Sequence, residues 1–121
     1  MEHLRIRQDL ATLHHLETQI AECEGLLVQT SGQALWQDRV VFLLQIPGFG
    51  LLTVMTILAA IGDVHRFPTA KHLVGYTGLG AGVHIRGETH HTGRITKQGG
   101  KDIRWALVEA AWSAVRWDRY W

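Results

Sequence analysis

The chain has 121 residues, with twelve Lys or Arg and eleven Asp or Glu, a length that fits one core or one core with a helical arm. The single cysteine, Cys23, excludes an internal disulfide, and eight His with one Cys match no familiar zinc spacing, so no metal site is expected. Because no run of about 18 apolar residues occurs and residues 1–5 lack a signal-peptide pattern, we expect a cytoplasmic protein with no membrane partner.

Residues 1–30 predict an amphipathic helix with a narrow apolar stripe. Such a stripe is typical of a helix packed on its own domain, of a helical hairpin or of a two-chain coiled coil, and about three heptads do not separate these alternatives. Among possible partners we expect a second copy of the chain, bound through residues 1–30. The stripe consists of Ile6, Leu13, Leu16, Ile20, Cys23 and Leu27.

A glycine-rich turn separates the next two predicted helices. Apolar spacing predicts a helix over residues 33–45 after a turn at 30–32, and an apolar helix over residues 51–61. Two glycines just before a helix let a phosphate approach the free amides of its first turn, as in helix-hairpin-helix modules that bind DNA. A plain interhelical turn is the alternative. The candidate phosphate-binding residues here are Pro47, Gly48, Phe49 and Gly50.

The second half predicts two helices around a long glycine-rich segment. Thr69 is expected to cap a short helix that Gly78 ends. Residues 78–100 contain seven glycines and predict a loop or a short hairpin. Residues 101–117 predict a helix with a bulky buried face, made of Ile103, Trp105, Val108, Ala111, Trp112 and Val115.

Positive charge gathers in this second half. Residues 1–62 carry three basic and six acidic side chains, whereas residues 63–121 carry nine basic and five acidic ones. A polyanion is therefore drawn to the second half. Residues 93–101 interleave cations, a hydroxyl and glycines, as a phosphate-binding loop requires, although a solvated basic loop has the same composition. The candidates in and after this segment are Arg94, Thr96, Lys97, Gly99, Lys101 and Arg104.

Five segments of the chain form a distinctive series: IPGFG, TILAAIGDVHRF, AKHLVGYTGLG, GRITKQG and IRWALVEAAW. In the order and spacing of these segments, the sequence between Gly48 and Ala111 closely resembles the C-terminal domain of the insertion-sequence-110 family of transposases. The resemblance implies a recombinase that moves DNA, and the better understood members use a structured guide RNA, so DNA and a guide RNA are expected partners. The helices before residue 46 resemble the family's coiled-coil arm.

The same resemblance implies two catalytic halves. One is a resolvase-like domain with four metal-binding carboxylates, and the other supplies a serine nucleophile. We expect no resolvase-like segment before residue 1, and therefore magnesium only where such a domain is present and no cofactor in this chain.

The family's serine position carries an arginine in this sequence. Seven residues before Gly93 the family usually has a Ser-Gly pair, and here Arg86 stands before the retained Gly87. Arginine has no hydroxyl and cannot attack a phosphate, so we expect no catalytic residue and count Arg86 and Gly87 as nucleic-acid contacts. Nearby hydroxyls are displaced along the segment and are poor substitutes: Thr89, Thr92 and Thr96.

Histidines and tryptophans of the second half have structural explanations. A metal site is disfavoured because neighbouring histidines point apart in an extended loop and no Cys or carboxylate cluster joins His84, His90 and His91. Four tryptophans could stack on bases, but their near-helical spacing favours a core or a partner-facing surface: Trp105, Trp112, Trp117 and Trp121.

The sequence thus predicts an all-α protein. A helical hairpin or coiled-coil arm over residues 1–45 precedes a compact helix-hairpin-helix-like domain over residues 46–121 with a glycine-rich basic loop. Its expected function is DNA binding in transposition, without catalysis by this chain alone. The alternatives are a helical oligomerisation or interaction module with incidental nucleic-acid binding, and a recombinase completed by another chain.

Overall fold

The computed structural model describes residues 1–86 and 89–117, with only the backbone described over residues 83–86 and 89–92. The described chain is mostly helical, which confirms the predicted fold class. Contacts divide it into two units, Met1–Val41 and Phe42–Trp121. The assignment of distinct functions to residues 1–45 and 46–121 stays a prediction.

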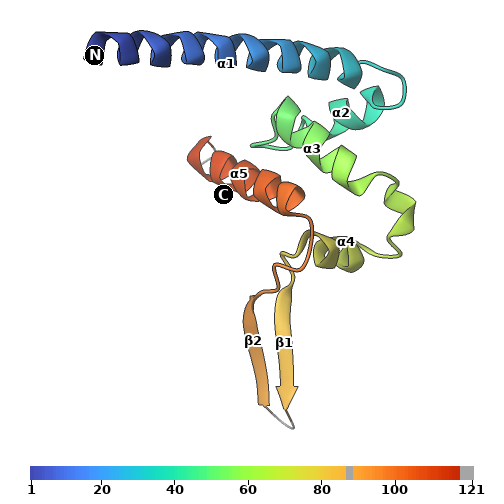
Figure 1. Ribbon diagram of the computed structural model, residues 1–121. Helices are drawn as coiled ribbons and strands as arrows, with labels where there is room; N and C mark the ends of the chain where they lie inside the picture. Colours follow the sequence, from blue (N-terminus) through green and yellow to red (C-terminus); the bar gives the residue numbers. More distant parts are fainter. Residues whose placement is uncertain (87–88, 118–121) are drawn as a thin grey trace. The chain divides into compact units, whose positions relative to one another are not determined.

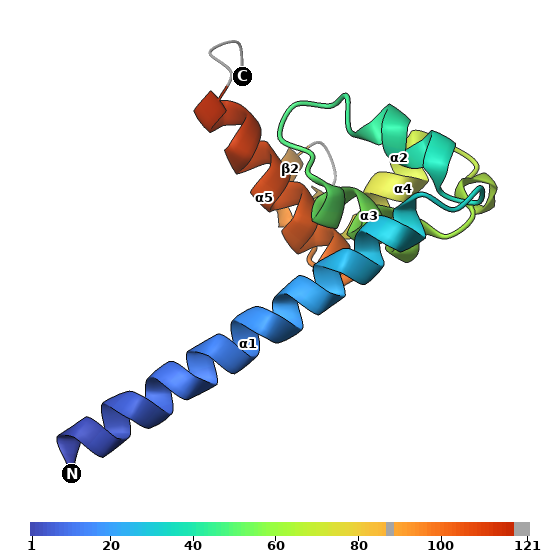
Figure 2. The same ribbon diagram turned by 90° about the horizontal axis from the view of Figure 1, so that it is seen from above.

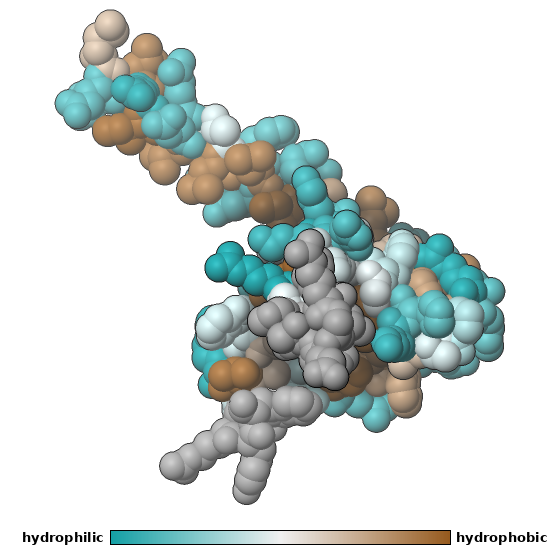
Figure 3. All heavy atoms as spheres, turned by 90° about the horizontal axis from the view of Figure 1, so that it is seen from below, coloured by the Kyte–Doolittle hydropathy of each residue, from teal (hydrophilic) through white to brown (hydrophobic). Residues whose placement is uncertain are grey.

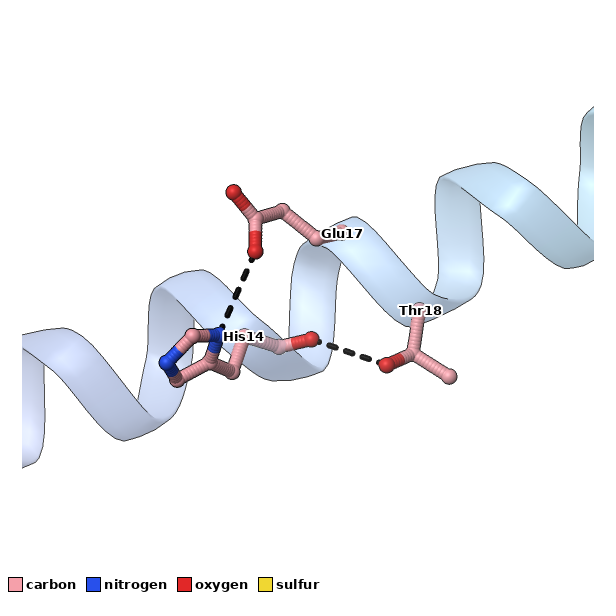
Figure 4. Close-up of polar contacts among 3 residues, drawn as sticks. All are labelled: His14, Glu17 and Thr18. Carbon is pink, nitrogen blue, oxygen red and sulfur yellow. Dashed lines mark hydrogen bonds and ion pairs between the residues drawn. The ribbon is translucent and has the colours of Figure 1, made fainter.

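The first unit is dominated by one uninterrupted helix, α1 (Glu2–Ser31), which Figures 1 and 2 show from the side. Several hydroxyls bond back onto it; Thr18 Oγ1, for example, donates to the His14 carbonyl at 2.9 Å (Figure 4). The ring of the same histidine forms a second contact, in which His14 Nδ1 lies 3.3 Å from Glu17 Oε2. Both side chains are exposed, so this pair contributes little stability.

No residue of α1 is buried. Apolar side chains of the predicted stripe are about half exposed, including Leu13 (50%), Leu16 (53%) and Ile20 (57%). Brown, apolar spheres accordingly recur along the surface of this helix in Figure 3. The predicted helix is confirmed, and its apolar stripe is left without a buried contact.

The second helix is shorter than predicted. It was expected over residues 33–45, and α2 spans Gln37–Leu43. Before it, Trp36 N donates to the Gln33 carbonyl at 2.9 Å in a turn, and after it Ile46 N donates to the Leu43 carbonyl at 3.1 Å. Proline at position 47 disfavours a helical conformation for the residue before it, which explains the early end.

The core of the second unit lies between α3 (Leu51–Ile61) and α5 (Lys101–Trp117), which pack side by side. Its centre is formed by Ile57 of α3 with Ile103 and Ala106 of α5. The buried residues of α5 are small apart from one isoleucine, so the two backbones can approach closely. They are Ile103, Ala106, Ala110 and Ala114.

This arrangement corrects the predicted buried face of α5. The helix itself has the expected bounds, and Ile103 is buried as expected, but the bulky residues on the other side of the helix point outward. α5 carries two apolar stripes, and the one with alanines packs on α3 because only it permits close contact. The exposed bulky residues are Trp105 (56%), Val108 (39%), Trp112 (63%) and Val115 (54%).

A 3₁₀ turn, η1 (Val64–Arg66), leads into the short helix α4 (Ala70–Thr77), whose predicted boundaries at Thr69 and Gly78 are confirmed. Tyr76 Oη donates to the carbonyl of Ala60, near the end of α3, at 3.0 Å. The Arg66 guanidinium lies 4.6 Å from the centroids of both the Phe67 and Tyr76 rings. These contacts fix α4 against the end of α3.

The glycine-rich segment forms a hairpin, one of the two predicted alternatives. Strands β1 (Ala81–Arg86) and β2 (Thr89–Ile95) are antiparallel, with a register shift between Ala81 and Val83. They run away from the helices of their unit in Figure 1. Gly87, which joins the strands, lies outside the described residues.

Candidate nucleic-acid interface

The basic segment after β2 forms an exposed loop. Arg94, Thr96, Lys97 and Lys101 are all exposed. Three of these four side chains are cations, and together they span the end of β2, the loop and the first residue of α5. These side chains form a surface on which positive charge is available to a polyanion.

The loop backbone is tied to the residues that follow α4. Thr96 N donates to the Gly80 carbonyl, and Lys97 N to the Gly78 carbonyl, both at 3.0 Å. Gly78 has a φ of 71° and Lys97 a φ of 56°, so each turns the chain through the left-handed region. The loop therefore has a defined backbone course.

Gly99 owes its place in this loop to packing. A Cβ at position 99 would overlap the Tyr76 carbonyl oxygen and lie 2.8 Å from Gly78 N. The backbone of the loop thus rests directly on the end of α4, where no side chain fits. Whether this glycine also approaches a phosphate stays a prediction.

The side chain of Arg104 also contacts the end of α4. Its Nη1 lies 3.5 Å from the Thr77 carbonyl, the last of α4, and the side chain is half-buried. Positive charge is favourable at a helix C-terminus because the terminal carbonyls have no intrahelical donors. Arg104 therefore helps to hold α5 and the end of α4 together, which sets it apart from the three exposed cations.

The turn before α3 lies elsewhere on the unit. Gly48 has a φ of 84°, and a Cβ there would overlap the Ala110 carbonyl oxygen and lie 2.8 Å from Ala114 N. Phe49 packs against the core cluster. The structure thus gives Gly48 and Phe49 a packing role, while Pro47 and Gly50 are exposed. A phosphate contact by these four residues stays a prediction.

The structure does not bring this turn and the basic loop into one site. The turn touches α5 at Ala110 and Ala114, whereas the end of α4, on which the loop rests, is bonded to α5 at Arg104. Six to ten helical residues correspond to about 9–15 Å along the helix axis. The basic loop is therefore the candidate interface, and the turn is a separate feature.

Replacing Gly48 by Ala should destabilise the protein by about 2–4 kcal/mol, because the new methyl group meets the α5 backbone in an unfavourable φ region. Gly50→Ala is the matched control, since nothing lies within 4 Å of its Cβ position and its φ is −93°. Urea unfolding of both variants measures the difference. Equal stability of the two variants would contradict the packing role of Gly48.

The serine-position candidates lie at the tip of the hairpin. Arg86 is the last residue of β1 and is paired with Thr89 across the strands, but its side chain and Gly87 lie outside the described residues. His84 is paired with His91 in the backbone register. Over the described residues, no group of three His, Cys, Asp or Glu could hold a metal ion.

Comparison with known proteins identifies the family. The sequence pattern of the transposase IS116/IS110/IS902 family matches residues 41–121, about two thirds of the chain. The chain belongs to this family. The match covers the whole of the second unit, including the hairpin, the basic loop and α5.

Individual curated proteins are also similar to this chain. A pilin gene-inverting protein of Moraxella bovis is 41% identical over 60% of this chain and 23% of its own length. The transposase for insertion sequence element IS1111A of Coxiella burnetii is 32% identical over 59% of this chain and 20% of its own. An insertion element IS110 protein of Streptomyces coelicolor is 30% identical over 63% and 19%. The chain therefore spans about a fifth of the length of these relatives.

Sequence reasoning missed the partners of the loop. Gly78 was expected only to end a helix. The hydrogen bond from Lys97 N to its carbonyl, and the one from Arg104 to the Thr77 carbonyl, were not expected. A glycine one residue after a helix was the available signal, but its contacts come from residues about twenty positions later. In the part of the chain that the structure describes, no helix is long and apolar enough to span a membrane.

Proposed function

We propose that this chain is a DNA-binding part of a transposase and acts in DNA transposition. The observation that carries the proposal is the basic loop. Its cations Arg94, Lys97 and Lys101 are exposed, while its backbone is fixed to the end of α4. Fixed cations lose less conformational freedom on binding than cations on a free segment, and they contact phosphates without reading sequence.

The relatives support DNA as the partner. One is named as a transposase and another as a pilin gene-inverting protein, so proteins similar to this chain rearrange DNA. A structured guide RNA is a second polyanion that the same loop could bind, as the resemblance to guided members implies. The proposal therefore covers both nucleic acids, with DNA as the expected principal partner.

Catalysis is not assigned to this chain alone. Arg86 stands where the family's serine is expected, so the hairpin offers a positive charge there and no attacking oxygen. The family's magnesium would need a carboxylate cluster, which the described residues do not offer, and no step is routed through a metal. Arg86 and Gly87 are proposed as contacts to the nucleic-acid backbone.

Binding of a short duplex, measured by fluorescence anisotropy at several salt concentrations, tests the proposal. Phosphate contacts give a linear fall of log K with log salt, with a slope of about −0.9 per contact. We expect a slope of about −3 or steeper and little dependence on duplex sequence. Failure to bind duplex DNA at low salt would contradict the proposal.

Self-association through α1 is a second candidate function. The observation that favours it is that a 30-residue helix has no buried residue and leaves the apolar stripe of Leu13, Leu16 and Ile20 half exposed. Hydrating such a stripe is unfavourable, and a second copy of the helix would cover it in a coiled coil.

Replacing Leu16 and Ile20 by Glu should convert an oligomer into a monomer, because four or more charges would meet in the seam. Gln8→Glu with Gln29→Glu adds the same charge to α1 outside the apolar stripe and should leave the oligomer intact. Sedimentation velocity measures both variants. A monomeric unmodified chain would show that α1 does not self-associate.

A further inference from the structure

An exposed tryptophan lies directly beside the candidate interface. Trp105 is in the second turn of α5 and is 56% exposed. It stands four residues after Lys101, and side chains at this spacing are neighbours on a helix, with Cβ atoms about 5–6 Å apart. A large flat apolar group therefore adjoins a cation of the basic loop.

The indole also forms one wall of an open depression of about 550 Å³ between α3 and α5. The other lining residues are small or short: Thr56, Ala59, Ala60 and Asp102. Methyl groups on one side and an indole on the other make an apolar shelf large enough for a planar heterocycle. In the described residues the indole has no hydrogen-bond or ring partner.

The charges around Trp105 decide what the shelf can accept. Lys101 lies on one side and Asp102, which lines the shelf, on the other. A phosphate is repelled by the carboxylate and drawn to the lysine, whereas an uncharged base can occupy the shelf. The two positions are within the reach of one nucleotide.

We infer that Trp105 stacks on an unpaired nucleobase whose strand is held by the basic loop. A base inside a duplex is stacked on both faces, so only a single-stranded or extruded base can offer a face to the indole. The inference rests on the proposed nucleic-acid binding and adds to it a preference for unpaired nucleotides.

Trp112 provides the contrast within the same helix. It is 63% exposed and lies on the same outward stripe, where helical spacing makes Val108, Val115 and the exposed Arg116 its neighbours. No cation of the loop adjoins it, and the depression beside Trp105 does not include it. A base held by Lys101 can reach Trp105 and not Trp112, which is about 10 Å farther along the helix axis.

The test compares the full chain with Trp105→Ala, Trp105→Phe and Trp112→Ala, using fluorescently labelled dT12, rU12 and a mixed-sequence DNA duplex. We expect Trp105→Ala to weaken binding of the single strands about tenfold or more, and duplex binding less than about twofold. Trp105→Phe should retain most of the affinity, and Trp112→Ala should match the unmodified chain. Single strands should also quench more indole fluorescence in the unmodified chain than in Trp105→Phe, a measurement that does not depend on the alanine variant folding.

The other possible results of this binding test decide between the inference and the proposed function. Equal losses on single strands and duplex, or no loss, would overturn the inference while leaving the proposed function in place. An equal loss with Trp112→Ala would show that the effect is not specific to the tryptophan beside the basic loop, and would overturn the inference as well. If Trp105→Ala lost affinity for only one of dT12 and rU12, the inference would be supported and the strand would be identified as DNA or RNA. If the unmodified chain bound none of the probes, the proposed function itself would fail.

Discussion

Replacing Arg94, Lys97 and Lys101 together by Ala will flatten the salt dependence of DNA binding. Each cation that contacts a phosphate contributes about 0.9 to the slope of log K against log salt, so the triple variant should lose nearly three units. At 0.1 M salt this corresponds to a loss of affinity of about 500-fold, because the change in log K is the slope change multiplied by the log of the salt concentration.

The three cations can be tested separately because all are exposed and none has a bonding partner among the described side chains. Each single variant should lower the slope by about one unit. Arg5, Arg7 and Arg116 changed together to Ala remove the same charge elsewhere and serve as the control. If both triple variants changed the slope equally, the effect would come from net charge and the loop would not be the interface.

The unmodified chain should leave a bound DNA substrate intact, with or without magnesium. A covalent protein–DNA intermediate requires an attacking oxygen aligned with the phosphate, and Arg86 supplies a positive charge in its place. Such a charge can stabilise a developing oxyanion but cannot form the bond. No adduct should therefore appear on a denaturing gel with labelled DNA.

Arg86→Ser should change little in this chain by itself, because the resemblance implies that a metal-bearing resolvase-like half is also needed. When that half is supplied as a second chain, adducts should form with Arg86→Ser and not with Arg86→Ala, which lacks the oxygen. The change is from no product to a detectable one. An adduct of the unmodified chain, mapped by mass spectrometry to Thr89, Thr92 or Thr96, would make the hairpin a relocated active site and contradict this prediction.

Helix positions could be predicted well because local signals fix them. Thr69 and Gly78 bound α4, and Lys101–Trp117 is α5 as predicted. The error at α2, which was expected to extend over residues 33–45, arose where turns at both ends compete with helical spacing. Periodicity reports which residues share a side of a helix, but turn bonds decide where the helix stops.

The candidate site was predicted in part. The basic loop and its exposed cations follow from the sequence, since charge and glycine content are local properties. The separation of the loop from the turn at residues 47–50 does not follow, because both segments were defined by composition alone. Only the packing of Gly48 on α5, and of Gly99 on the end of α4, shows that these glycines serve different contacts.

The sequence by itself determined the helical class, the segments that identify the transposase family and the concentration of positive charge after residue 62. Tertiary structure alone decided which side of α5 is buried. That helix carries an alanine stripe and a tryptophan stripe, and either could form a core on hydrophobicity. The alanine stripe packs on α3 because small side chains let two backbones approach, and this leaves Trp105 and Trp112 on the outside.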